Sequence, residues 1–524
     1  MAQTNVDTSI STLKFKLDTA KRFVDAMKLS TNNLYMFAGK PDPWLPDDED
    51  PPEANNTVQS VSYDYWRNMF FCKKISALDI KLMIDRYNWT TGTKYTAYDD
   101  KVDLSDTSFY VLTDDNNVYK CLFNNGGIAS TTKPEGHVTG TTTTADGYIW
   151  KFMYNLSTES VDEFLVTTHV PVEVLSSDDG SFQWDTQAAA VNTGIEIINV
   201  EDGGSGYDLH TGNAGSSSTI SIVYLDTGTE IDLSDSDNRY VGSVLHITSG
   251  TAEGDAREIT AYNGTTKVAT VNGDFSIALE ACSTYSIAPK VSIGGEGTGC
   301  IAVSQMTSNS ISTIDVLEEG SGYRNAYGDW DATNSEYSSI VTISANGGST
   351  ANATAIISPE GGHGSNAYAE LLAYNTLVKA KFSGSETDTL TITNDYRQFG
   401  LILNPIASAN DTVYEEDTAK QYTSIAFDTL AGTFILDSNV SGLTSEATGR
   451  VLDVNSSVLN LYSTTGTFEA DETIRQEAGI TCNVVSVTEP VLVPYTGEML
   501  VIASREEISR ATDQAEAFHY IFNF

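Results

Sequence analysis

Two stretches of this chain repeat each other closely enough to dictate the kind of structure around them. IINVEDGGSGY, residues 197–207, aligns without gaps with TIDVLEEGSGY, residues 313–323, and both end in Gly-Ser-Gly-Tyr. Each copy alternates apolar and polar residues before its glycines, which is the two-residue period of a strand that runs into a turn. The repeat therefore predicts two copies of one small β unit.

A second pair of similar segments extends the repeat. KVSIGGEGTGCIAV, residues 290–303, parallels IVTISANGGSTANATAII, residues 340–357, and each reads as a strand, a glycine turn and a second strand. A stretch between about 218 and 287 interrupts the first copy and is typical of a compact antiparallel barrel or sandwich. Further along, residues 432–454 are echoed by 466–487, which predicts a second, internally duplicated β module.

Length and charge narrow the class of protein. At 524 residues the chain is too long for one ordinary core, so we expect about three to five domains. Its net charge of -42 disfavours contact with bare nucleic acid or an anionic membrane surface, because either would add like-charge repulsion. Solubility is the simplest role of this acidity, and a calcium-dependent role is the alternative. No stretch approaches ~18 consecutive apolar residues, so no membrane segment is predicted.

The five cysteines are widely spaced and include no C-x-x-C pair. An odd number without paired spacing argues against a disulfide framework or a zinc site and favours a reducing compartment.

The N-terminal part mixes helix and strand signals. Residues 62–71 read as a second helix, and 109–123 as a hairpin whose turn falls at 114–117. The first helix is predicted from an apolar stripe at Leu13, Leu17, Ala20, Val24 and Met27.

The predicted fold class is therefore an α+β frame with N-terminal helices, interrupted by mainly-β insertions that form small sandwich-like or barrel-like modules with glycine-rich repeats. The predicted division is an N-terminal α+β part of the frame at 1–175, a β-repeat insertion at 176–359 with the nested module at about 218–287, a return to the frame at 360–405, a second inserted β module at 406–489, and C-terminal strands completing the frame at 490–524.

The sequence offers no positive sign of catalysis or of a cofactor. GGEGTGC, residues 294–300, lacks the third glycine of a dinucleotide fingerprint and leads into a strand rather than a helix. Neither a P-loop nor a G-x-S-x-G motif occurs, and acidic pairs arise by chance in a chain with 71 acids. We therefore predict no enzyme, no cofactor and no small-molecule substrate.

Two segments are candidates for a metal site. In GGHG, residues 361–364, His363 stands between glycines and is therefore expected to be exposed and conformationally free. Because the other histidines show no paired spacing that would complete a site, a turn is preferred to a metal site. Asp232, Asp235 and Asp237 lie close together, but the segment lacks the glycine and closing glutamate of an EF-hand loop. A solvated loop is preferred to a calcium site, and no metal site is predicted.

The chain closes on aromatic residues at alternate positions: Phe518, Tyr520, Phe522 and Phe524. One face of a terminal strand would then be aromatic. The strand is either an ordinary core strand or, in part, a docking face for another subunit, since large aromatic residues dominate interface energetics. These four residues and Trp44 are the candidate partner-interface residues.

Four segments together resemble one known family. They are FAGKPDPW at 37–44, NWTTGTKY at 88–95, DYRQFGLILNP at 395–405 and the closing run 497–524. In this order they resemble the gene-product-eight family of baseplate wedge proteins from contractile-tailed bacteriophages. The similarity covers roughly 10–175, 360–405 and 490–524, and GGHG followed by SNAYAELLAY resembles the re-entry into the conserved frame.

The resemblance implies a structural protein of the myophage tail. It would link peripheral and inner wedge proteins and take part in virus assembly and in baseplate rearrangement before sheath contraction. It also implies a non-enzymatic homodimer, with other wedge proteins as partners and without nucleic acid or membrane contact, located in the virion baseplate after assembly in the host cytoplasm. The β-repeat insertions depart from the family pattern and leave the outer contacts open.

Two other functions remain as alternatives. The tyrosine-rich β modules favour a receptor-binding or carbohydrate-binding tail protein, and a polysaccharide-degrading tail enzyme comes third.

Overall fold

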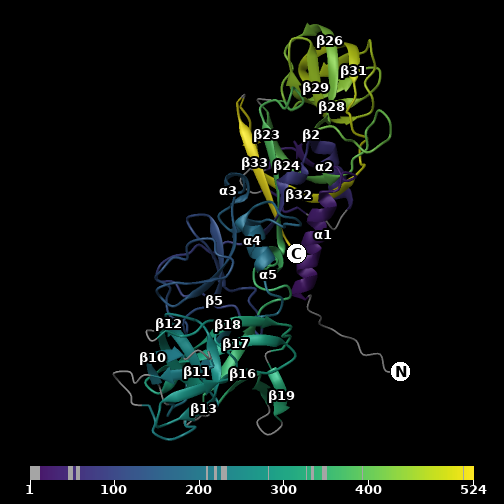
Figure 1. Cartoon of the computed structure of the whole chain (residues 1–524). Helices are drawn as coiled ribbons and strands as arrows, with labels where there is room; N and C mark the ends of the chain where they lie inside the picture. Colours follow the sequence, from purple (N-terminus) through teal and green to yellow (C-terminus); the bar gives the residue numbers. More distant parts are fainter. Residues whose placement is uncertain are drawn as a thin grey trace, which may run out of the picture. The chain divides into compact units, whose positions relative to one another are not determined.

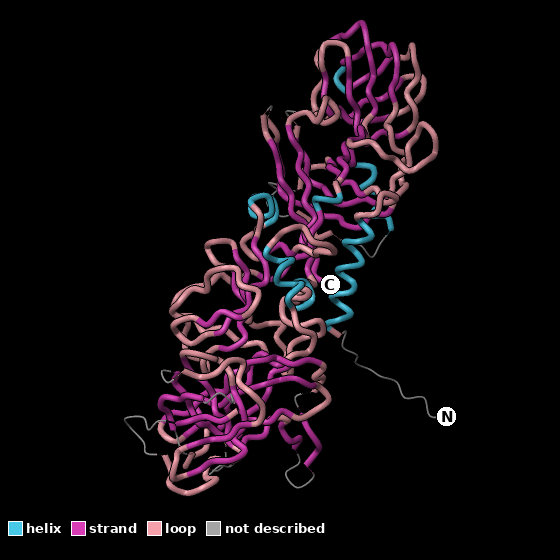
Figure 2. The backbone as a smooth tube through the Cα atoms, viewed as in Figure 1, coloured by secondary structure: helices cyan, strands magenta, loops and turns pink. Residues whose placement is uncertain are grey.

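Strands dominate the computed structural model, with 46% of residues in strands and 10% in helices. It describes residues 12–44, 51–54, 59–207, 210–216, 221–225, 233–280, 283–325, 327–331, 336–344, 348, 351–391, 394–511 and 513–524. Figure 2 shows how strands outnumber helices along the backbone. The β-rich character predicted from the sequence is confirmed.

The predicted α+β frame with N-terminal helices is wrong. The described residues form many sheets, including two six-stranded barrels, and five α-helices. The apolar stripe of the first helix does bury Leu17, Ala20 and Val24. However, the predicted second helix ends early, since Met69–Lys74 is a strand. The helices are α1 (Leu13–Met27), α2 (Gln59–Asn68), α3 (Thr158–Phe164), α4 (Phe182–Ala189) and α5 (Ala367–Glu370), with short 3-10 turns at Ala77–Asp79 and Glu477–Gly479.

The chain divides into two compact units. Unit 1 comprises Met1–Ile84, Asp162–Val172 and Ala373–Phe524, and unit 2 comprises Asp85–Val161 and Glu173–Leu372. The domain boundaries drawn from the sequence stay a prediction.

Unit 1 contains two open sheets and a barrel (Figure 1). The larger sheet has the order β25 (Thr418–Lys420), β2 (Met69–Lys74), β1 (Leu34–Gly39), β24 (Asp395–Leu403) and β32 (Glu498–Ser509). The smaller has the order β33 (Ala515–Asn523), β23 (Asn375–Ser383), β3 (Ile80–Asp85) and β8 (His169–Val172).

Strands from opposite ends of the chain are neighbours in the larger sheet. β1 pairs antiparallel with β24, so that Phe37 lies opposite Gly400. β24 in turn pairs with β32. Rings of the two sheets also meet, because Phe382 of β23 lies 5.2 Å from Phe71 of β2 between ring centroids. Unit 1 is thus assembled from residues before 85 and after 372, with β8 between them in sequence.

Each unit contains one closed six-stranded antiparallel barrel. That of unit 1 has the cyclic order β26 (Thr423–Ala431), β29 (Val458–Thr465), β28 (Thr448–Val454), β27 (Asn439–Gly442), β30 (Thr473–Gln476) and β31 (Ile480–Thr488). That of unit 2 has the cyclic order β11 (Ile222–Leu225), β14 (Val268–Val271), β13 (Ala256–Asn263), β12 (Ser243–Ser249), β15 (Ser283–Pro289) and β10 (His210–Ser216).

The two barrels have the same strand order apart from a circular permutation. Number five strands of each barrel by their order in the chain, from β26 to β30 and from β11 to β15. Around both barrels, neighbouring strands then follow the order first, fourth, third, second, fifth. The sixth strand, β31, follows the others in the chain in one barrel, whereas β10 precedes them in the other. The predicted internal duplication in unit 1 corresponds to two hairpins, β27 with β28 and β30 with β31.

The rest of unit 2 is also built from sheets. One has the order β4 (Tyr110–Leu112), β5 (Asn117–Phe123), β7 (Ile149–Asn155) and β6 (Thr141–Thr143), and it contains the predicted hairpin. A second has the order β17 (Thr298–Thr307), β18 (Ser310–Ser321), β9 (Ile195–Asp202) and β22 (Asn352–Ile357). Two ribbons pair β16 (Val291–Ile293) with β21 (Val341–Ile343), and β19 (Tyr327–Asp331) with β20 (Glu336–Ser339).

The sequence repeats are related by an approximate two-fold axis. β9 and β18 carry equivalent segments and pair antiparallel, with Ile198 opposite its repeat equivalent Ile314. The equivalent strands β16 and β21 also pair with each other, and the equivalent β17 and β22 occupy opposite edges of the sheet. Within one chain, the two copies therefore pack against each other through equivalent strands, as the two subunits of a symmetric homodimer do.

The closing tyrosine of each copy packs on a glycine of the other. A Cβ added to Gly297 would overlap the ring of Tyr323, and one added to Gly348 would overlap the ring of Tyr207. Both tyrosines are buried. Because the rings need the space that a side chain would fill, these glycines are required for close packing rather than for an unusual backbone angle.

We expect Gly297→Ala and Gly348→Ala each to destabilise the protein by about 1–3 kcal/mol, since overpacking displaces the tyrosine ring. Gly140→Ala is the matched control, because a Cβ there meets nothing within 4 Å. Thermal unfolding of the three variants provides the measurement. Unchanged stability in both repeat variants would contradict the proposed packing role.

Candidate interaction site

The predicted aromatic face of the last strand is used for packing inside unit 1. The ring centroid of Phe518 lies 5.4 Å from that of Phe382 and 5.3 Å from that of Phe399. The ring of Tyr520 lies 6.5 Å from Phe399. These two residues of β33 therefore contact strands β23 and β24.

The other two aromatic residues of the closing run pack against the first helix. Phe522 and Phe524 lie 5.6 and 5.5 Å from Phe23 of α1 between ring centroids. All four residues remain partly exposed. The packing is that of a core strand, and the assignment of these residues to a partner interface stays a prediction.

Trp44 contacts the edge of the other sheet. Its indole Nε1 donates a hydrogen bond of 2.7 Å to the backbone carbonyl of Arg505 in β32. Arg505 also lines a groove with Phe518 and Tyr520. The structure thus brings Trp44, Phe518 and Tyr520 to one region, whereas Phe522 and Phe524 lie against α1.

The groove lies between the edge strands of the two sheets and has a volume of about 660 Å³. Residues 505–508 of β32 and 517–520 of β33 line it, together with Phe399 and Pro51. A bulge shapes its β32 wall, because the pairing with β24 places residues 505–507 opposite Arg397 alone. Bulges re-aim side chains, and sequence patterns did not reveal this one.

A buried lysine connects segments 37–44 and 395–405 to the barrel of unit 1. Lys40 Nζ lies 2.6 Å from a carboxylate oxygen of Asp395 and 2.7 Å from one of Asp437. It also donates a hydrogen bond of 2.6 Å to Asn394. Since Asp437 precedes β27 and Asn394 precedes β24, this one ammonium group connects the larger sheet to the barrel.

Unit 2 contains a second buried charge cluster, which includes the histidine of GGHG. Lys120 Nζ lies 3.0 Å from His363 Nδ1 and 3.0 Å from Glu370 Oε2. The same ammonium lies 3.9 Å from the ring centroid of Tyr98. The side chains of His363 and Glu370 are each 2% exposed. The expectation that His363 is exposed is therefore wrong.

The glycines explain why this histidine lies inside. Gly361, Gly362 and Gly364 all have positive φ, and a Cβ at Gly362 would overlap the backbone of Val191. The turn therefore approaches a neighbouring segment closely and directs the imidazole inward rather than to solvent.

Burial and the nearby ammonium determine the charge states in this cluster. Burial, with the charge of Lys120, lowers the pKa of His363 to about 3, so the imidazole is neutral. Burial alone would raise the pKa of Glu370, but Lys120 and hydrogen bonds to the carboxylate bring the pKa to about 2. Burial lowers the pKa of Lys120, and the Glu370 carboxylate opposes that shift. At 3.0 Å the ammonium and the carboxylate form an ion pair that is closed to solvent.

A third buried charge cluster lies in unit 2 and contains Lys151 and Glu196. Its carboxylates are less completely paired than Glu370 is. Lys151 Nζ lies 3.5 Å from Glu196 Oε1, and both side chains are 3% exposed. Among the described residues no hydrogen-bond partner reaches Glu196 Oε2 or Glu319 Oε2. Burial raises the pKa of Glu196 to about 7, and the nearby Glu319 adds to the rise. Proton uptake at Glu196 therefore falls near neutral pH.

These clusters are arranged as ionic networks rather than as reaction centres. Their side chains are nearly closed to solvent, so a substrate would have no access to them in this structure. Sequence spacing could not reveal them, since Lys120, Lys151, Glu196 and Glu370 come from separate elements.

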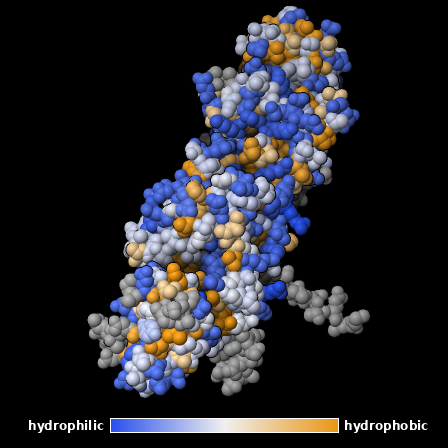
Figure 3. Space-filling model, viewed as in Figure 1, coloured by the Kyte–Doolittle hydropathy of each residue, from blue (hydrophilic) through white to orange (hydrophobic). Residues whose placement is uncertain are grey.

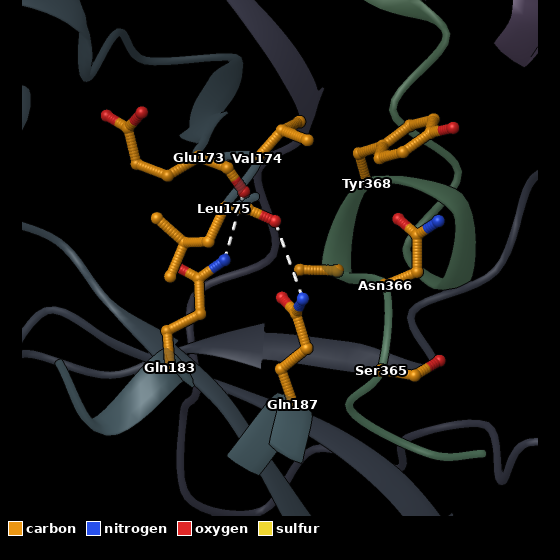
Figure 4. Close-up of a pocket in the computed structure, with 9 residues that line it drawn as sticks. Glu173, Val174, Leu175, Gln183, Gln187, Ser365, Asn366 and Tyr368 are labelled. Carbon is orange, nitrogen blue, oxygen red and sulfur yellow. Dashed lines mark hydrogen bonds between the residues drawn. The ribbon is translucent and has the colours of Figure 1, made fainter. Parts of the chain in front are cut away.

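A small pocket in unit 2 is lined mainly by polar groups already in use. Gln183 Nε2 donates to the carbonyl of Glu173 at 3.0 Å, and Gln187 Nε2 to that of Leu175 at 3.4 Å (Figure 4). Asn366 and Tyr368 lie on the other side. Its volume of about 100 Å³ is below the roughly 300–1,000 Å³ of typical ligand sites. The pocket has room for water rather than for a substrate.

The acidic loop considered for calcium forms other contacts. Asp235 lies 2.7 Å from Lys267 Nζ, and Asp237 accepts a hydrogen bond of 2.9 Å from the backbone of Gly264. Asp232 lies outside the described residues. No cluster of three or more potential metal ligands occurs in the described part of the chain. Within that same part, none of the helices combines the length and apolarity that crossing a membrane requires.

The barrel of unit 1 presents a polar hollow of about 510 Å³ on its surface. Ser441, Thr448, Arg475 and Glu477 line it beside the exposed Leu443. Figure 3 shows apolar side chains scattered over this barrel on a largely hydrophilic visible face. The hollow combines polar groups with an apolar contact, which is relevant to the carbohydrate-binding alternative.

No protein-family model matches this sequence, and comparison with curated proteins finds no match. The baseplate interpretation therefore rests on the quoted residues and on where they lie.

We expect Lys120→Met to destabilise the protein by about 3–5 kcal/mol, because it leaves the Glu370 carboxylate buried without its counter-charge. Adding Glu370→Gln should recover part of that loss in a double-mutant comparison. Lys133→Met is the control, since its acidic partners are exposed, and it should change little. Chemical denaturation provides the measurement, and wild-type stability of Lys120→Met would contradict the ion-pair assignment.

A pH series tests the environment of Glu196. Its folded-state pKa is raised from an ordinary value of 4.5 to about 7, so its stabilising contribution is complete below 4.5 and is lost as pH rises through 7. Glu196→Gln should remove this loss, an effect of up to about 3 kcal/mol, since one pKa unit corresponds to about 1.4 kcal/mol. Glu201→Gln, at an exposed site on the same strand, should retain the wild-type pH profile. A wild-type profile in Glu196→Gln would contradict the assignment.

Proposed function

We propose that this chain is a structural component of a myophage tail baseplate wedge. It would link peripheral and inner wedge proteins and take part in baseplate assembly and in the rearrangement that precedes sheath contraction. The proposal includes a homodimeric, non-enzymatic protein that works in the virion and is assembled in the host cytoplasm.

One observation carries the proposal: three of the four segments that resemble the wedge family meet in unit 1. Segment 37–44 includes Phe37–Gly39 of β1, which pairs with 398–400 of β24 in segment 395–405. Trp44, at the end of segment 37–44, is hydrogen bonded to Arg505 in segment 497–524. Segments that resemble one family in the same order, and that pair across more than 350 residues of sequence, are expected of one ancestral body with material inserted into it.

The fourth segment, 88–95, lies in unit 2 and supports the proposal only through its sequence. Within that segment, Tyr95 is buried and accepts a hydrogen bond of 2.7 Å from the backbone of Thr90. Tyr95 therefore stabilises a local turn.

The chemistry of the described side chains supports a structural role. Lys120 and Lys151 each hold a buried carboxylate in an ionic contact closed to solvent, and the buried Lys40 bridges two partly exposed carboxylates. These contacts join separate elements of the fold.

Co-expression with the other wedge proteins of the same phage tests the proposal. We expect the chain to co-elute with at least one of them in a stoichiometric complex, and to be found by mass spectrometry in purified baseplates. Tail tube protein in place of the wedge proteins is the control and should not co-elute.

A chain that ignores every wedge protein and is missing from purified tails would contradict the proposal. Binding to a glycan array under those conditions would instead favour the carbohydrate-binding alternative, for which the polar hollow near Ser441 is the supporting observation.

A further inference from the structure

The last strand presents a free edge. The backbone of Phe524 donates to Tyr374 and that of Gly384 donates to Gln514, which establishes that even-numbered residues of β33 bond to β23. The odd-numbered residues Ala517 and His519 therefore direct their N–H and C=O groups away from β23. In the described part of the chain, no strand pairs with that edge.

This edge lacks the features that normally protect an exposed strand. Residues 515–523 contain neither lysine nor proline, and their pairing with β23 has no bulge. Their one acid, Glu516, is 10% exposed and is bonded to Arg510 at 3.0 Å. An unprotected row of backbone donors and acceptors is suited to pair with an added strand.

The groove beside this edge offers complementary surfaces. Phe399 and Phe518 give it an apolar lining. Tyr520 is another lining residue. On the facing strand, the carbonyl of Arg505 accepts a hydrogen bond from Trp44.

The charge of the groove indicates the kind of segment that fits. Glu506 and Glu507 are both exposed on the β32 wall, against one cation, Arg505. The guanidinium of Arg397 lies 3.0 Å from a carboxylate oxygen of Glu507 and neutralises part of its charge. The whole chain carries a net charge of -42, so an acidic partner segment would be repelled and a basic one attracted.

We propose that the groove between β32 and β33 binds an extended, basic segment of a partner protein, which adds as a strand to the free edge of β33. The inference goes beyond the baseplate role, because the edge and the groove do not depend on which assembly the chain joins. Failure of peptide binding would leave the wedge proposal intact, and failure of wedge association would leave this one intact.

The test uses the full chain and a short synthetic peptide of alternating valine and lysine, with fluorescence anisotropy as the readout. We expect saturable binding that weakens with salt. Ala517→Pro should weaken it about tenfold or more, since proline removes an outward N–H while the ladder to β23 stays intact. Ala517→Val keeps the N–H and is the matched control.

Several results would overturn the proposal. Ala517→Pro with wild-type melting and wild-type peptide binding would exclude the edge. Equal binding of a peptide of alternating valine and glutamate would exclude the charge argument. If the chain instead self-associates in light scattering, and Ala517→Pro alone makes it monomeric, the edge belongs to a second copy. No binding of either peptide by the wild-type chain would exclude the groove as a docking site.

Discussion

The close approach of three strands at Gly400 is the constraint on which the larger sheet of unit 1 depends. A Cβ at this position would overlap the backbone carbonyl of Val501 and come within 2.9 Å of the ring of Phe37. Gly400 lies opposite Phe37 in β1 and opposite Ile502 in β32. Only glycine lets β1 and β32 pack on either side of β24 at this spacing.

The contacts around Gly400 extend through the rest of the unit. Phe37 packs edge-on against Tyr65 of α2 at 6.2 Å, and the hydroxyl of Tyr65 is hydrogen bonded to Ser504 of β32 at 2.9 Å. One helix is thereby attached to strands from both ends of the chain. Lys40, directly after β1, then joins this sheet to the barrel through Asp437. The aromatic packing at Phe37 and the ion pair at Lys40 thus lie only three residues apart in the chain.

Local patterns predicted local structure, and they failed where long-range pairing decided the outcome. The stripe of α1 and the hairpin at 109–123 follow from short-range periodicity and turn residues, and both are present. The fold class was wrong because strands hold 46% of the residues and helices only 10%, in many sheets and two six-stranded barrels. At α2, for example, the helix gives way at Met69 to a strand that pairs with β1, a long-range contact that the helical pattern does not encode.

The candidate site shows the same limit. The alternation of Phe518, Tyr520, Phe522 and Phe524 could be read directly, since a strand has a period of two. Their packing partners Phe23, Phe382 and Phe399 could not, because they come from three other elements. His363 was placed at the surface because glycines suggest mobility, whereas here they allow a close turn that buries it.

The order of strands in the larger sheet has a consequence for protein synthesis. β1 ends at Gly39 and its neighbour β24 begins at Asp395, so a ribosome needs about 20 to 70 s to make the intervening chain at roughly 5–20 residues per second. Throughout that delay β1 and β2 can pair with each other, but the other edge of β1 lacks its native partner β24. On a polysome, neighbouring nascent chains therefore compete with the native partner for this edge, so sparse ribosome loading favours correct folding.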